Sequence, residues 1–119
     1  MGTEREQGST VAAASGPPPV DVETISETIR RALRFGSIRP SREELAATDE
    51  ALRGHVAVLL GDLRATAGRY LPDRHRVGRI EQLMADPLGK GILSADAEVH
   101  QRARDCQWLL AYHTARAGW

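Results

Sequence analysis

The chain has 119 residues, and its 16 Lys plus Arg are balanced by 16 Asp plus Glu. This length suits one domain with its own core, and the zero net charge argues against a strongly basic nucleic-acid surface or a polybasic membrane anchor. Aromatic residues make up only 4% of the chain, which favours helices and argues against an all-β fold.

The cysteine content and the N-terminus bear on the compartment. Cys106 is the single cysteine, so it forms no internal disulfide, and it has no Cys partners for a structural zinc site. The first residues carry charges where a signal peptide would have a basic stretch and an apolar run. No stretch of about 18 apolar residues occurs that could span a bilayer. We therefore expect a cytoplasmic protein without a membrane partner.

The composition divides the chain near residue 20. Residues 1–20 are rich in Gly, Ser, Thr, Ala and Pro and contain the triproline Pro17–Pro19. Such a segment predicts a disordered tail, in which the prolines act as a stiff spacer. Residues 21–119 carry the helical patterns and are predicted to form one helical bundle domain.

Two helices are predicted in the first half of the domain. The first begins at Asp21 or at Thr24, because Thr24 and Glu27 match a capping box, and it ends near Gly36. Its apolar face is formed by Val22, Ile25, Ile29, Ala32 and Leu33. The second helix begins after Ser41, where Ser41 and Glu44 match another capping box, and its pattern continues to Pro72.

Two further helices are predicted in the second half. The third follows Asp73, buries Val77, Ile80 and Met84, and ends at Pro87 and Gly89. The last follows Ser94 as N-cap, and its apolar positions recur at steps of three and four. The expected fold is all-α, a small bundle of about four helices around one long central helix.

The long second helix carries two different seams. The large residues form the expected core face, made of Leu45, Leu52, Val56, Leu59, Leu63 and Tyr70. On the opposite side, small residues alternate at spacings of four and three and define the small-residue face: Ala47, Ala51, Gly54, Val58, Gly61, Ala65 and Gly68. Such a face predicts a second packed helix, supplied either by the fourth helix or by another copy of the chain. We favour a second chain, because the other helices are needed on the core face.

Histidines and the cysteine are the candidates for chemistry. His55, Cys106 and His113 could line a pocket between helices, as a small enzyme or a ligand-binding bundle would require. Cys106 and His113 lie two helical turns apart, about 10 Å, which is too far to share one metal ion. We therefore predict no metal, no cofactor and no catalytic residue. The competing interpretation makes His113 an imidazole at the edge of the core, His55 a residue that orients packing beside Asp62, and Cys106 a small buried hydrophobe.

Two surface features could serve binding. Arginines gather around the second interhelical turn, where they could meet an anion: Arg69, Arg74, Arg76 and Arg79, with His75. The alternative is that these arginines are solvated and balance acidic helix faces. On the last helix, Trp108, Tyr112 and Trp119 are predicted to form an exposed aromatic stripe, typical of an interface, or else to pack against the loop around residues 88–93.

Two segments resemble a known family. The stretch LRGHVAVLL, from Leu52 through Leu60, is similar to the signature of a family of small actinobacterial proteins of unknown function, labelled natural-product biosynthesis proteins. The segment 99–113, with His100, Arg102, Arg104, Leu110 and His113, is similar to that family's final helix. Family members often carry a Cys-Asp-His-Tyr run near the end, of which only His113 carries over here. The resemblance extends from about residue 25 to the C-terminus and implies a context in secondary metabolism but no activity.

These features give three hypotheses of function. The first is a non-catalytic helical accessory or regulatory protein that binds another protein or a second copy of itself. The second is a small enzyme or ligand-binding bundle in natural-product biosynthesis. The third is a nucleic-acid-binding regulator, which the charge balance and the composition of the third helix disfavour.

Overall fold

The computed structural model describes residues 19–67, 73–86, 88 and 94–117. Four α-helices run through these ranges, namely α2 (Val22–Leu33), α3 (Arg42–Ala67), α4 (Arg74–Ala85) and α5 (Ala95–Ala117), and a short 3-10 turn, η1 (Arg34–Gly36), follows α2. The described ranges contain no strand, so the predicted all-α fold is confirmed. The long second helix is α3 with 26 residues, and α5 with 23 residues is nearly as long.

Local capping fixes where the helices begin. Ser41 and Glu44 form the predicted capping box at α3, with Ser41 Oγ accepting from the Glu44 amide and Glu44 Oε1 accepting from the Ser41 amide, each at 3.1 Å. Asp73 caps α4 by accepting from the Arg76 amide at 3.0 Å, and Ser94 Oγ accepts from the Ala97 amide at the start of α5. These three predicted starts are confirmed.

The start of α2 corrects one detail of the sequence analysis. Asp21 is the N-cap, and its carboxylate accepts from both the amide and the hydroxyl of Thr24. The capping box predicted from Thr24 and Glu27 is therefore wrong, because the Thr24 side chain is already bound by Asp21. Val22, predicted on the buried face, is 38% exposed, so that part of the prediction is wrong.

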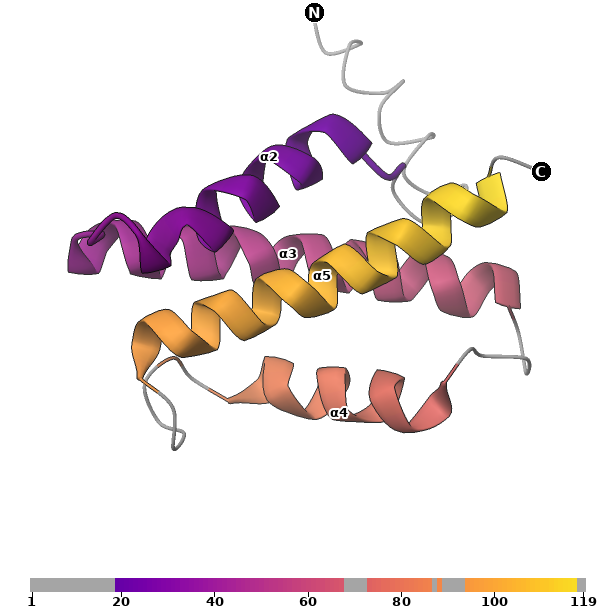
Figure 1. Cartoon of the computed structure of the whole chain (residues 1–119). Coiled ribbons are helices and arrows are strands. Elements are labelled where there is room, and N and C mark those ends of the chain that lie inside the picture. The colour runs from indigo at the N-terminus through magenta and orange to yellow at the C-terminus, as the bar shows by residue number, and fades with distance from the viewer. Residues whose placement is uncertain (1–18, 68–72, 87, 89–93, 118–119) are drawn as a thin grey trace, which may run out of the picture.

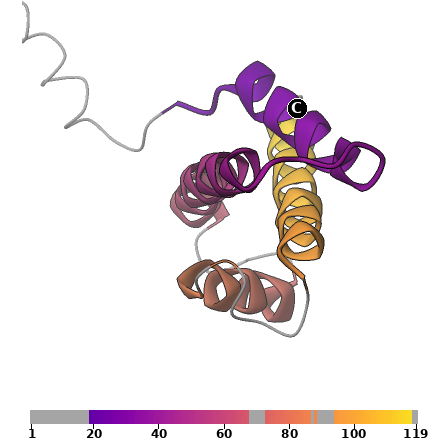
Figure 2. The same cartoon turned by 90° about the vertical axis from the view of Figure 1, so that its left-hand side faces the viewer.

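The four described helices pack around a common core. Viewed along the bundle, α3 and α5 lie side by side in the middle, with α2 across one side of the pair and α4 across the other (Figures 1 and 2). The core between them combines the predicted seam of α3 with apolar residues from the other helices: Ile25, Ile29, Ala32, Leu52, Val56, Leu59, Leu63, Val77, Ile80, Val99, Ala103, Cys106, Leu109 and Leu110. Leu45 and Met84 pack partly buried at its edge.

Several predicted features lie outside the described residues. These are residues 1–18 of the predicted tail, Tyr70 of the core seam, Gly68 of the small-residue face, Arg69 of the arginine cluster, and Trp119 of the aromatic stripe. Within the described ranges, no helix is long and apolar enough to cross a membrane.

Candidate functional site

A buried ion network joins three helices. Asp49 on α3 and Arg102 on α5 are both buried, and the Arg102 Nε donates a hydrogen bond to Asp49 Oδ1. The second oxygen, Oδ2, accepts from the Nε of Arg53 at 2.7 Å. Buried charges are stable only when paired and hydrogen-bonded, and one carboxylate here serves two guanidinium groups. The four-residue spacing of Asp49 and Arg53 is the only local hint of this network, and the sequence analysis missed it.

The same two arginines hold the C-terminal end of α4. Arg102 donates to the carbonyl of Leu83 at 3.0 Å, and Arg53 donates to the carbonyls of Met84 and Asp86. The last carbonyls of a helix have no partner within the helix. Guanidinium groups from α3 and α5 therefore supply hydrogen bonds that α4 cannot make for itself, and they fix the position of its end.

A second carboxylate cluster lies near the C-terminal ends of α3 and α5. Asp62 Oδ2 is 2.9 Å from Nδ1 of His113 and accepts from Nη2 of Arg116 at 2.8 Å. Burial by itself would raise the pKa of Asp62, but the hydrogen bonds from His113 and Arg116 outweigh it and hold the pKa below its ordinary value. His113 is thus a partly buried imidazole at the core edge, hydrogen-bonded to another helix, and Asp62 is its partner rather than that of His55.

His55 and Cys106 lie in separate environments. Nε2 of His55 is 3.1 Å from the hydroxyl of Thr28 on α2, and partial burial lowers the pKa of His55. Cys106 is fully buried in the core, where burial, and secondarily the Asp105 carboxylate, raise the pKa of its thiol to about 12. A thiol with that pKa stays protonated at neutral pH, so it is not an activated nucleophile. His55, Cys106 and His113 therefore contact different parts of the fold, namely Thr28 of α2, the hydrophobic core and Asp62 of α3.

The aromatic stripe predicted on the last helix is only partly exposed at its two described positions. Trp108 and Tyr112 are partly buried and pack against the core. The guanidinium of Arg76 on α4 lies 4.6 Å from the centre of the Trp108 ring, and that of Arg116 lies 5.7 Å from the Tyr112 ring. Neighbouring side chains cover these rings in part, and Arg76 reaches Trp108 from another helix. Residues 89–93 of the loop that was the alternative contact lie outside the described residues.

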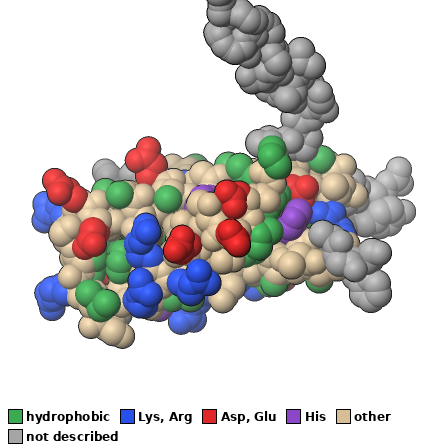
Figure 3. All heavy atoms as spheres, turned by 90° about the horizontal axis from the view of Figure 1, so that it is seen from above, with side chains coloured by type: hydrophobic (Ala, Val, Ile, Leu, Met, Phe, Trp, Pro, Cys, Tyr) green, Lys and Arg blue, Asp and Glu red, His purple; other side chains and the backbone are tan. Residues whose placement is uncertain are grey.

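The members of the predicted arginine cluster do not all face the same way. Arg76 turns toward α5, where its Nη2 lies 3.4 Å from the buried carboxylate of Asp105. Arg74, His75 and Arg79 are exposed on α4. On the α2 side of the molecule, basic and acidic side chains are interspersed, with no field of a single sign (Figure 3). Arg76 is therefore paired inside the fold and does not belong to an exposed arginine cluster.

The small-residue face of α3 is open in the single chain. Ala47, Gly54, Gly61 and Ala65 are exposed, and Ala51 and Val58 are half-buried. A methyl group placed on Gly54 or Gly61 would meet no atom of another described element within 4 Å. The alternative in which the fourth helix covers this face is therefore wrong, because α5 packs on the opposite, large-residue side of α3.

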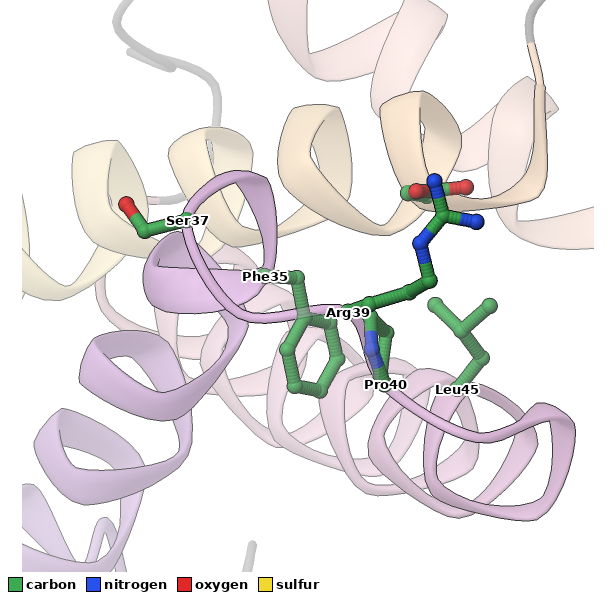
Figure 4. Close-up of a pocket in the computed structure, with 6 residues that line it drawn as sticks. Phe35, Ser37, Arg39, Pro40 and Leu45 are labelled. Atoms are coloured by element: carbon green, nitrogen blue, oxygen red, sulfur yellow. The ribbon is translucent and has the colours of Figure 1, made fainter.

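An open cavity of about 500 Å³ lies where η1, the start of α3 and the start of α5 come together. It is lined by Phe35, Ser37, Arg39, Pro40, Leu45 and Asp96 (Figure 4). Of these residues, the sequence predicted a role only for Leu45, as part of the core face of the second helix. Five of the six lie between residues 35 and 45, but Asp96 comes from α5 and the residue types are ordinary, so no local pattern predicts the cavity.

The family model for a family of unknown function, DUF6415, matches residues 23–118. This range covers most of the chain. The chain belongs to DUF6415. No curated protein and no solved structure matches the chain. The match confirms a family of unknown function, and it carries neither the actinobacterial nor the natural-product label that the sequence resemblance implied.

The chemistry open to this DUF6415 protein follows from the state of its polar groups. The described part of the chain contains no group of three His, Cys, Asp or Glu side chains that could hold a metal ion. The buried carboxylates and the conspicuous histidines are engaged in contacts between helices, which is a structural use. Among the described residues, the small-residue face of α3 and the cavity beside Phe35 are open to the outside.

Proposed function

We propose that this DUF6415 protein is a non-catalytic helical accessory or regulatory protein that acts by protein–protein interaction. The observation that carries the proposal is the exposed small-residue face of α3, defined by Ala47, Ala51, Gly54, Val58, Gly61 and Ala65 within the described residues. The resemblance noted from the sequence suggests secondary metabolism as its context. The engagement of Cys106, His55 and His113 inside the fold supports a role in binding over a role in catalysis.

The glycines on this face call for a partner. A glycine inside an exposed helix costs about 1 kcal/mol relative to alanine, so Gly54 and Gly61 together cost about 2 kcal/mol. No close contact within the described residues compensates for this cost, because both positions have room for a side chain. A second helix lying close along α3 would compensate, since glycine and alanine allow two backbones to approach. The face therefore suits another helix better than solvent.

The charges beside the face favour a second copy of the chain, paired antiparallel. Glu50 and Arg64 are exposed and stand immediately before Ala51 and Ala65, on the same flank of the face and toward opposite ends of α3. In an antiparallel pair, each Glu50 comes near the partner's Arg64. Arg64 pairs with Glu81 within the chain, but exposed ion pairs contribute only about 0 to 1 kcal/mol, so this pair can be exchanged.

The variant Gly61→Leu tests this pairing. Leucine has room in the single chain, so the helical circular dichroism and the melting temperature of the monomer should be preserved. In a close helix pair the same side chain forces the backbones apart, and overpacking costs about 1 to 3 kcal/mol. Sedimentation equilibrium should therefore report a dimer for the parent chain and a shift toward monomer for the variant.

Gly78→Leu is the matched control, because Gly78 is an exposed helical glycine on α4 that also has open space around it. It should leave the mass unchanged. Glu50→Lys should weaken the dimer, and Glu50→Lys combined with Arg64→Glu should restore it. A parent chain that sediments as a monomer at high concentration, or a dimer indifferent to Gly61→Leu, would contradict the proposal.

A further inference from the structure

The cavity beside Phe35 combines an apolar floor with charged walls. Phe35 is only 7% exposed, and Pro40 and Leu45 are half-buried, so the floor is fixed by the packing of η1 and of the start of α3. The Phe35 ring and the Leu45 side chain lie on either side of Pro40, and the Arg39 side chain extends away from them (Figure 4). A volume of about 500 Å³ lies within the range of about 300 to 1,000 Å³ that small-molecule sites occupy.

The two charged residues of this cavity have opposite signs and are not paired with each other. Arg39 precedes α3, and Asp96 lies in the first turn of α5. Both side chains line the cavity, yet neither side chain forms an ion pair or a hydrogen bond with another residue of the described ranges. By contrast, the buried carboxylates Asp49 and Asp105 are both engaged by arginines. The cavity is therefore lined by one positively and one negatively charged side chain that have no ion-pair partner among the described residues, beside an apolar surface.

We propose that this cavity binds a free α-amino acid with an apolar side chain. Arg39 would receive the carboxylate, for which a guanidinium offers two parallel N–H donors. Asp96 would accept from the ammonium group. The side chain of the ligand would pack against the half-buried Pro40 and Leu45 and remove their remaining apolar surface from water. A zwitterion is the ligand class that uses all three features at once. A ligand with only a negative charge would be repelled by Asp96, and a ligand with only a positive charge would be repelled by Arg39.

The site is independent of pairing through α3. It lies where η1, the start of α3 and the start of α5 meet, and it shares no residue with the small-residue face. Binding and dimerisation can therefore fail separately, and each proposal has its own readout.

The experiment is a titration of the full chain with L-phenylalanine and with L-leucine, followed by calorimetry and by amide chemical shifts, at ligand concentrations up to about 10 mM. Phenylacetate, which lacks the ammonium group, and phenethylamine, which lacks the carboxylate, are the matched ligands. Both should bind at least about tenfold more weakly than phenylalanine, a loss of about 1.4 kcal/mol. This comparison uses the parent chain, so it does not depend on any variant folding.

Variants then assign the charges. Arg39→Gln and Asp96→Asn should each weaken phenylalanine binding by about tenfold or more. Arg104→Gln, on the exposed surface of α5, and Glu43→Gln, in the first turn of α3, are the controls for loss of a charge and should leave binding unchanged. The proposal is overturned if neither amino acid binds, if phenylacetate binds as well as phenylalanine, or if only one of the two cavity variants weakens binding.

Discussion

Removal of the buried carboxylate of Asp49 should strongly destabilise the fold. Asp49 accepts from Arg102 and Arg53, whose side chains are 8% and 23% exposed, so Asp49→Ala leaves the guanidinium of Arg102 buried without a counter-charge. Breaking a buried pair by removing one partner costs about 3 to 5 kcal/mol. Both arginines keep their hydrogen bonds to the end of α4, which favours the lower end of that range.

A loss of about 3 kcal/mol corresponds to a fall of about 12 to 24 °C in melting temperature for a domain of about 100 residues. Urea unfolding followed by circular dichroism measures the change in the free energy of unfolding. Glu27→Ala, at an exposed acidic position on α2 outside both proposed binding surfaces, is the control and should stay within about 0.5 kcal/mol of the parent. The double variant Asp49→Leu with Arg102→Met should be more stable than Asp49→Ala, because it leaves no unpaired buried charge. A loss below about 1 kcal/mol for Asp49→Ala would refute this reasoning, since that is the contribution of a surface pair.

Two predictions follow from the pKa shifts. With a thiol pKa of about 12 and full burial, Cys106 should resist iodoacetamide at pH 8 in the folded chain and react once the chain is unfolded in urea; rapid labelling of the native protein would contradict its placement in the core. Burial lowers the pKa of His55 and the Asp21 carboxylate only partly opposes this, so the unfolded state binds the proton more readily, and stability should fall as the pH drops below the ordinary value of 6.5. In urea unfolding between about pH 5 and 8, the free energy of unfolding of His55→Gln should fall less with decreasing pH than that of the parent. Parallel curves of unfolding free energy against pH for the two proteins would count against this prediction. Asp62, whose pKa is lowered, does not contribute to this fall, because its stabilisation is lost only below its ordinary pKa of 3.8.

The helices and their core face could be read from the sequence because both depend on short spacings. Ser41, Asp73 and Ser94 reach amides three residues away, so a cap is visible in a few letters of sequence. The apolar period of α3 likewise marks the side that is buried, since every position on that face lies within a few residues of the next.

The candidate sites depended on which helix faces which, and no local pattern contains that information. Asp49 meets Arg102 and Asp62 meets His113 only because α3 and α5 lie side by side, so these pairs were not predicted. Trp108 appeared to point to solvent on a helical wheel, but Arg76 of α4 covers it.

The sequence by itself determined the four helices of the described residues and the strongly apolar face on the second predicted helix, because hydrogen bonds and side-chain periodicity within a helix are local. Only the tertiary structure decided that the small-residue face of α3 stays uncovered in a single chain and that Arg39 and Asp96 line one cavity. The physical reason is that burial and ion pairing depend on distances between segments far apart in the chain, and those distances are set by how the helices pack together.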